Sequence, residues 1–288
     1  FNVELFRSMG DLGLLRLTVD PEHGGSGTDP VAVTIVHEEL SAYDPAFALS
    51  YLAHTLLFAN NLQVNGTEEQ RKKYLPAACT GEAIGGMCMS EPGAGTDVLG
   101  MRTTARRDGD DYVISGAKMW ITNSPKADFM CLLANTSDDK PHKNKTLMIV
   151  PMNTPGITFS PHLNKLGMRS SETAQVFLDD VRIPQRNRIG AEGTGFMMQM
   201  LQFQEERMWG AANVIKALEN CVTQTIEYCR ERKTFGQPLI DNQYIHFRLA
   251  ELQTEIEALR ALTYQACELH VEGKDVTKLA SMAKLKAG

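Results

Sequence analysis

The sequence predicts an α+β protein in which a sheet domain lies between two helical domains. Three observations lead to this fold class: helical spacing of apolar residues up to about residue 87, alternating strand patterns from residue 88 to about 184, and helical spacing again from residue 195. We therefore expect an N-terminal helical domain, a middle antiparallel β-sheet domain and a C-terminal helical bundle, at residues 1–87, 88–190 and 191–288.

The N-terminal domain is predicted from two stretches with apolar residues three and four positions apart, at residues 31–42 and 47–64. A loop rich in glycine precedes them at residues 21–27. Asn65-Gly66 is a stop signal for the second helix, and Thr67 with Gln70 forms a capping-box pattern. A further short helix should therefore run toward Tyr74.

The middle domain is predicted from four stretches rich in β-branched and aromatic residues. Their connections are polar and turn-rich, as is typical of surface loops between antiparallel strands. The four expected strands are residues 111–115, 129–133, 146–150 and 174–178.

The C-terminal domain is predicted from long helices that run from Gly195 to about Arg230 and from about Asn242 to His270. A third helix should begin near Asp275. Leucine and isoleucine residues mark one face of the second helix, and such a stripe must be buried against neighbouring helices. We therefore expect a helical bundle.

Composition excludes several classes of protein. The formal net charge is -6, and acidic residues interrupt basic clusters such as residues 230–233, so a nucleic-acid partner is not expected. No apolar run approaches the length of a membrane span, so no membrane partner is expected. The six cysteines and the scattered histidines show no metal-type spacing, which predicts reduced thiols and no metal site.

Two segments carry the chemical information. In Cys88–Gly100, three glycines leave backbone N–H groups uncovered, and Ser90 and Thr96 add hydroxyls, so the segment can bind a polar ring edge. About twenty residues later the chain reads Trp-Ile-Thr-Asn, and Trp120 offers a flat aromatic face. Taken singly, these residues are more typical of a turn that leads into a strand with a core tryptophan.

Taken together, the two segments resemble the signature of the acyl-CoA dehydrogenase family, and the resemblance covers essentially the whole chain. Residues 21–27, 74–76, 165–169 and 232–236 agree with the family in sequence order. Residues 49–54 together with 165–169 are most similar to the isovaleryl-CoA dehydrogenase branch. Family members continue through further helices beyond the position of Gly288, so we expect the C-terminal part of this protein to be missing from the chain.

The resemblance implies FAD-dependent α,β-dehydrogenation of a short branched acyl-CoA thioester to the trans-2-enoyl-CoA. Electrons would pass to an electron-transfer flavoprotein. Alternatives are a long-chain acyl-CoA dehydrogenase, an acyl-CoA oxidase and a non-catalytic subunit. The compartment implied is the mitochondrial matrix for a eukaryotic source and the cytoplasm for a bacterial one.

The resemblance also implies roles for individual residues. In the isovaleryl-CoA and long-chain branches the catalytic base directly precedes an arginine on a long helix, and here that place belongs to Glu206, before Arg207. Arg207 would lie near the substrate thioester. Without the resemblance, Gln204-Glu205-Glu206-Arg207 is typical of a solvated helix face. The residues implied to contact FAD in the middle domain are Met89, Ser90, Thr96, Trp120, Ile121 and Thr122, and Thr96 is also a candidate contact to the CoA moiety.

Three further residues resemble family positions that reach the FAD of a neighbouring subunit. Arg232 and Thr234 would contact the pyrophosphate and Gln243 the adenine side. The functional unit would then be a homotetramer, a dimer of dimers. A basic cluster at a helix C-terminus explains Arg232 equally well in isolation.

Overall fold

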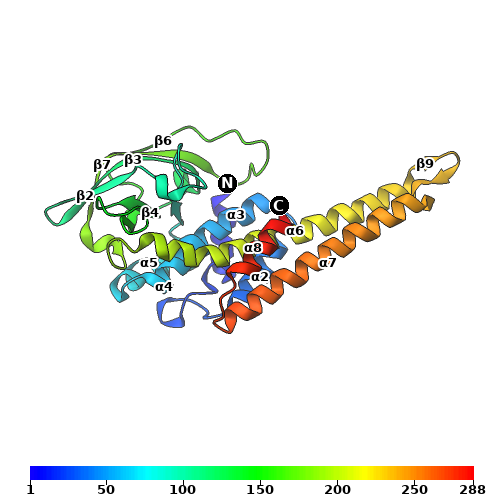
Figure 1. The fold of residues 1–288 in the computed structure, drawn as a ribbon, viewed down its shortest axis with the longest axis horizontal. Coiled ribbons are helices and arrows are strands. Elements are labelled where there is room, and N and C mark those ends of the chain that lie inside the picture. Colours follow the sequence, from blue (N-terminus) through cyan, green and yellow to red (C-terminus); the bar gives the residue numbers. More distant parts are fainter. The chain divides into compact units, whose positions relative to one another are not determined.

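The computed structural model describes residues 1–288 and divides them into two compact units. The first unit comprises residues 1–29 and 49–203, and the second comprises residues 30–48 and 204–288. Along the chain, helices come first, a sheet follows and long helices end the sequence (Figure 1). The predicted fold class is confirmed, whereas the three domain boundaries remain predictions.

The helices of the first unit follow the predicted pattern. The Thr67–Gln70 capping box is present, because Gln70 N donates to the Thr67 hydroxyl over 3.3 Å and Thr67 N donates to Gln70 Oε1 over 3.0 Å. The helix that it starts is longer than expected and ends at Gly81, whose φ of 74° is favourable for glycine. The elements are α1 (Val3–Asp11), α3 (Pro45–His54, only its end in this unit), a π-helical turn (Thr55–Asn60), α4 (Asn61–Asn65) and α5 (Glu68–Thr80).

The sheet contains eight strands in the order β6-β7-β3-β2-β4-β5-β8, with β1 beside β4. Most pairs are antiparallel, as predicted, but β1 and β4 are parallel, and β2 meets β4 in one parallel pair of residues. The four predicted strands are β3 (Asp111–Thr122), β4 (Phe129–Asn135), β5 (Lys145–Pro151) and β7 (Thr173–Pro184). The strands not predicted are short: β1 (Gly85–Cys88), β2 (Thr104–Asp108), β6 (Ile157–Phe159) and β8 (Arg188–Ile189).

Strand β4 is buried on both faces and connects the two cores of the first unit. Cys131 and Leu133 pack with helical residues such as Phe58 and Leu75. The side chains of Met130, Leu132 and Ala134 point to the other face and join a core built almost entirely from strand residues. Burial on both faces explains why β4 reads as an uninterrupted apolar run rather than as an alternation.

A buried histidine joins three elements at the start of the sheet. His54, the last residue of α3, has its Nε2 3.0 Å from the carbonyl oxygen of Ala78 in α5, and its Nδ1 accepts from the backbone N of Gly85 over 2.9 Å. These two bonds define a neutral ring that donates at Nε2 and accepts at Nδ1. Asn123 donates to the Gly85 carbonyl over 3.1 Å. The first residue of β1 is therefore fixed from two sides.

The second unit is helical. It contains α2 (Pro30–Ser41), most of α6 (Gly195–Glu231), α7 (Gln243–Val271) and α8 (Thr277–Ala287). Its apolar core joins α6, α7 and α8 through residues that include Ala211, Leu259 and Ala283. The helices agree with the predicted C-terminal bundle, and none of them is long and apolar enough to cross a membrane.

Polar and aromatic contacts attach α2 to this bundle. The buried Glu38 carboxylate pairs with Arg260 of α7, which also pairs with Glu219 of α6, and the Tyr264 hydroxyl donates to Glu38 over 2.8 Å. On the same helix, His37 is buried with its ring centroid 6.1 Å from that of Trp209. A paired charge and a tilted pair of aromatic rings together hold α2 in place.

Gly85 is predicted to be essential for packing. A Cβ built on it would lie 2.3 Å from ring atoms of Phe58, whereas a Cβ on Gly93 would meet nothing within 4 Å. Gly85→Ala should lower the free energy of unfolding by about 1–3 kcal/mol because the Phe58 ring must move. Gly93→Ala, the matched control, should change it by no more than about 0.5 kcal/mol. Urea unfolding of both variants measures this, and equal stabilities would contradict the prediction.

Candidate functional site

The glycine-rich loop, residues 89–100, leaves the sheet at the end of β1 and ends in a 3-10 turn at Val98–Gly100. Added Cβ atoms at Gly93 and Gly95 would meet nothing within 4 Å, so this stretch of backbone is open to a ligand. Ser90 is half-buried and Thr96 is exposed. The loop therefore presents the backbone and hydroxyl groups that the sequence predicted.

Trp120 protrudes from the sheet because β3 contains a bulge. Lys118 pairs with Val176 and Ile121 pairs with Ala174, so β3 has one more residue than β7 across this interval. The extra residue lets Lys118 and Ile121 both point inward, and Trp120 takes a φ of 64° with 61% of its surface exposed. A positive φ is rare for a bulky residue, and such strain is most often found at functional sites.

Several members of the predicted flavin set lie together in the first unit. The backbone N of Met119 donates to the Ser90 carbonyl over 2.8 Å, which places Ser90 beside the strand that carries Trp120 and Thr122. Neither the Ser90 nor the Thr122 hydroxyl has a hydrogen-bond partner within the chain. Ile121 differs, because its side chain is buried in the sheet core and only its backbone could contact a ligand. Met89 is half-buried against the other core.

Two fully buried lysines at this site were missed by the sequence analysis. Lys118 Nζ donates to the Met89 carbonyl and to Glu91 Oε1, both over 3.0 Å. Lys145 Nζ lies 3.1 Å from the Leu99 carbonyl and near three further oxygens. The loop is therefore held near both ends by ammonium groups. The one sequence signal that could have identified Lys118 is its position, two residues before Trp120.

Glu206 lies on α6 in the second unit and is partly buried. Burial raises the pKa of its carboxyl above the ordinary glutamate value, and the positive charges of Arg207 and Lys284 offset part of that rise. Lys284, on α8, lies against α6 one turn further along, because its Cδ and Cε are 3.4 Å from a Cβ position on Gly210. The surroundings of Glu206 therefore favour a carboxylate that takes up a proton readily.

The adjacent glutamate has a different environment. Glu205 Oε1 lies 3.4 Å from Nε2 of His270, at the end of α7, and this contact raises the pKa of His270 above its ordinary value. The sequence analysis favoured Glu206 over Glu205 as the base. That choice between the two glutamates stays a prediction.

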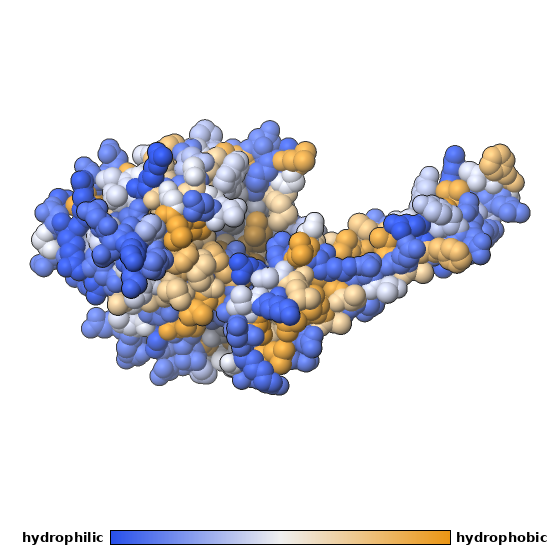
Figure 2. Space-filling view, viewed as in Figure 1, coloured by the Kyte–Doolittle hydropathy of each residue, from blue (hydrophilic) through white to orange (hydrophobic).

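Arg232, Thr234 and Gln243 lie together at the end of the α6–α7 hairpin. The strands β9 (Lys233–Thr234) and β10 (Gln237–Pro238) form a small hairpin there, closed by Phe235 and Gly236 with φ of 52° and 82° (Figure 1). All three side chains are exposed, and so is the entire Phe235 side chain. Figure 2 shows hydrophobic surface at this tip among hydrophilic residues.

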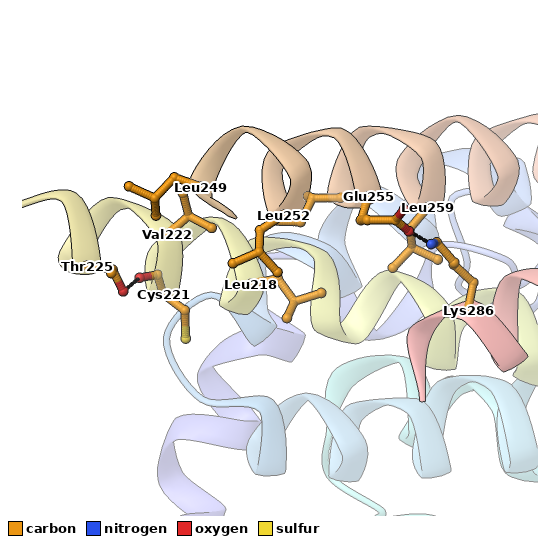
Figure 3. Close-up of a pocket in the computed structure, with 10 residues that line it drawn as sticks. Leu218, Cys221, Val222, Thr225, Leu249, Leu252, Glu255, Leu259 and Lys286 are labelled. Carbon is orange, nitrogen blue, oxygen red and sulfur yellow. Dashed lines mark hydrogen bonds and ion pairs between the residues drawn. The ribbon is translucent and has the colours of Figure 1, made fainter. Parts of the chain in front are cut away.

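An apolar groove of about 370 Å³ lies between α6 and α7 (Figure 3). Leu218 and Val222 of α6 face Leu249 and Leu252 of α7 across it, and the Lys286–Glu255 ion pair lies at one end. None of the predicted site residues lines this groove. The wall of the groove on α7 is formed by part of the apolar stripe that the sequence predicted for that helix.

One group of side chains has the composition of a metal site. Ligand atoms of Asp20, Glu22 and His23 lie within 4.8 Å of one another. However, Asp20 already accepts from Gln63 over 2.6 Å, and His23 Nε2 faces Glu68 over 3.4 Å. No predicted site residue belongs to this group, so it adds no metal to the candidate site.

Comparisons with known proteins agree with the order of helices, sheet and helices along the chain. Three family models match the chain in order: the acyl-CoA dehydrogenase N-terminal domain at residues 1–82, the middle domain at 86–181 and the C-terminal domain at 193–288. Cyclohexane-1-carbonyl-CoA dehydrogenase of Syntrophus aciditrophicus (strain SB) is 39% identical over 285 residues, which cover 99% of this chain and 74% of that protein.

Two further relatives complete the comparison. The mitochondrial isovaleryl-CoA dehydrogenase of Oryza sativa subsp. japonica is 35% identical over 273 residues, covering 95% of this chain and 67% of that protein. The structure of butyryl-CoA dehydrogenase from Megasphaera elsdenii is 34% identical, with a TM-score of 0.96 over 100% of this chain and 76% of the other.

Proposed function

Because the chain belongs to the acyl-CoA dehydrogenase family, we propose that it oxidises a short branched acyl-CoA to the trans-2-enoyl-CoA with Glu206 as the base. The observation that carries this proposal is the environment of Glu206. A carboxylate that burial makes a better base, next to an arginine on a long helix, is suited to remove the weakly acidic α-proton of a thioester.

The residues of the glycine-rich loop and β3 fit an FAD. The Ser90 and Thr122 hydroxyls have no partner within the chain, so they can bind the polar edge of the ring without breaking another bond. The exposed Trp120 offers a face beside the ring, while Met89, Thr96 and the backbone of Ile121 complete the set. FAD, when bound, supplies the acceptor for the hydride that leaves Cβ.

The protein's own part in the reaction is proton removal and orientation. The Glu206 carboxylate takes the proton from Cα, and the electron pair of that C–H bond becomes the new Cα–Cβ double bond as hydride leaves Cβ. Arg207 would bind oxygens near the thioester and hold the substrate in register with the base. General base catalysis contributes about 10²–10⁴-fold, so binding and carbonyl polarisation supply the remainder.

The short branched substrate is the finer part of the proposal. Residues 49–54 and 165–169 are most similar to the isovaleryl-CoA dehydrogenase branch, and an isovaleryl-CoA dehydrogenase is among the relatives. A relative named for cyclohexane-1-carbonyl-CoA also acts on an acyl group that is not a straight chain. Isovaleryl-CoA is therefore the first substrate to test.

The partners also follow from the family and are part of the proposal. Arg232 and Thr234 would bind the FAD pyrophosphate of a neighbouring subunit and Gln243 its adenine side, which their exposure at the hairpin tip allows. The assembly would be a homotetramer that passes electrons to an electron-transfer flavoprotein. A eukaryotic source would place it in the mitochondrial matrix and a bacterial one in the cytoplasm.

Glu206→Gln is expected to slow the reduction of the flavin by substrate. In the purified, FAD-loaded protein, isovaleryl-CoA added without oxygen should bleach the flavin absorbance, and Glu206→Gln should slow bleaching by at least about 10²-fold because the base is lost. Glu205→Gln is the matched control and should bleach at nearly the wild-type rate. Bleaching of Glu206→Gln at nearly the wild-type rate would place the base elsewhere, and no bleaching in the wild type would argue against this substrate.

Lys284→Met is expected to move the pH dependence of flavin reduction. Glu206 acts as a base only when ionised, and the Lys284 charge favours that form, so removing it should raise the pKa of Glu206 further. The acidic limb of the reduction rate should therefore shift to higher pH, with little change above it. Lys286→Met removes a nearby lysine paired with Glu255 and should leave the limb in place. If the acidic limb lies at the same pH in Lys284→Met and Lys286→Met, this role for Lys284 is contradicted.

A further inference from the structure

The segment at residues 89–91 is held to β3 and to the residues just before β2 by a chain of bonds that starts at the Lys118 ammonium. Lys118 binds the Met89 carbonyl and the Glu91 carboxylate over 3.0 Å each. Glu91 in turn accepts from the backbone N of Arg102 over 2.6 Å and of Thr103 over 3.0 Å. Ser90, between the two groups that Lys118 binds, is attached to Met119 through its own carbonyl.

Both members of the ion pair are buried, and their charges depend on each other. Burial alone would disfavour the Glu91 carboxylate, but the Lys118 charge and the two backbone donors hold the pKa of Glu91 below its usual range. Loss of Lys118 would leave a buried carboxylate without the ammonium group that is bonded to it, which is strongly unfavourable. The position of residues 89–91 therefore depends on Lys118.

Lys118 also lies at the base of the β3 bulge. The register with β7 is lost between Lys118 and Ile121, and Trp120 projects to solvent within this interval. The side chain of Lys118 thus fixes the loop that carries Ser90, while its backbone begins the bulge that turns Trp120 outward. Lys118 therefore connects the two parts of the predicted flavin contact, Ser90 on the loop and Trp120 on β3.

We propose that Lys118 is a positioning residue that fixes Ser90 against Trp120, so that both meet the flavin ring in one geometry. The inference rests on the proposed function, because it needs FAD as the bound group. Lys145 provides the comparison. It is equally buried and has four oxygen neighbours where Lys118 has two, but its one hydrogen bond to the loop is at Leu99, beyond the predicted flavin contacts.

The test compares Lys118→Met with Lys145→Met in the purified protein, by FAD titration of the apoprotein, visible circular dichroism of the bound flavin and thermal unfolding. Both variants should lose thermal stability. Lys118→Met should raise the Kd for FAD by at least about 10-fold, since hydrogen bonds to the ring become misplaced, and should change the flavin dichroism. Lys145→Met should leave the dichroism unchanged and the Kd within about 3-fold of the wild type.

Glu91→Gln is the second variant and keeps the test decisive if Lys118→Met does not fold. The amide oxygen can still accept a backbone bond, but the charge that holds Lys118 is lost, so the dichroism should change in the same sense. Unchanged dichroism in a folded Lys118→Met or Glu91→Gln, or equal weakening of FAD binding in Lys118→Met and Lys145→Met, would overturn the inference. A wild type that binds no FAD would overturn the proposed function as well.

Discussion

The buried Lys118–Glu91 pair is the interaction on which the arrangement of the candidate flavin contacts depends. The glycine-rich loop has no strand or helix over most of its length, and its own backbone hydrogen bonds are few, such as those between Glu91 and Ala94. Burying two charges is costly unless each is fully hydrogen-bonded. Here the carboxylate has the ammonium and two backbone donors, which lets a stretch without regular structure keep one conformation.

Local patterns in the sequence were sufficient for most helices and for the longer strands. The Thr67–Gln70 capping box and the apolar stripe of α7 are signals contained within a few turns. The bulge at Trp120 could not be predicted, because it depends on the register between β3 and β7, whose paired residues are more than fifty positions apart. Lys118 and Lys145 were missed for a related reason. A lysine in a strand is normally exposed. The burial of Lys118 depends on oxygens of the distant residues Met89 and Glu91, and that of Lys145 on the distant Leu99 together with oxygens close to it in the chain.

The candidate site residues divide between environments with different physical demands. Ser90 and Thr122 need free hydroxyls and a rigid support, which the sheet and the buried lysine provide. As the proposed base, Glu206 would need the opposite balance, because the carboxylate of a base must be destabilised enough to accept a proton yet remain ionised at working pH. Burial acts in the first direction, and Arg207 and Lys284 act in the second. A sequence motif marks the position of Glu206 but not the charges on another helix that adjust it.

Two of the buried histidines, His37 and His54, make acid sensitivity a property of both compact units. Burial lowers the pKa of His54 to about 4 and that of His37 to about 3, against an ordinary value of 6.5. At a pH below 6.5 but above the lowered pKa values, these two histidines are protonated in the unfolded chain and neutral in the folded one. The free energy of unfolding therefore falls as the pH drops below 6.5. His54 belongs to the first unit and His37 to the second. Mild acid therefore weakens the sheet junction and the helical bundle over the same interval, and the protons taken up on unfolding would number about two.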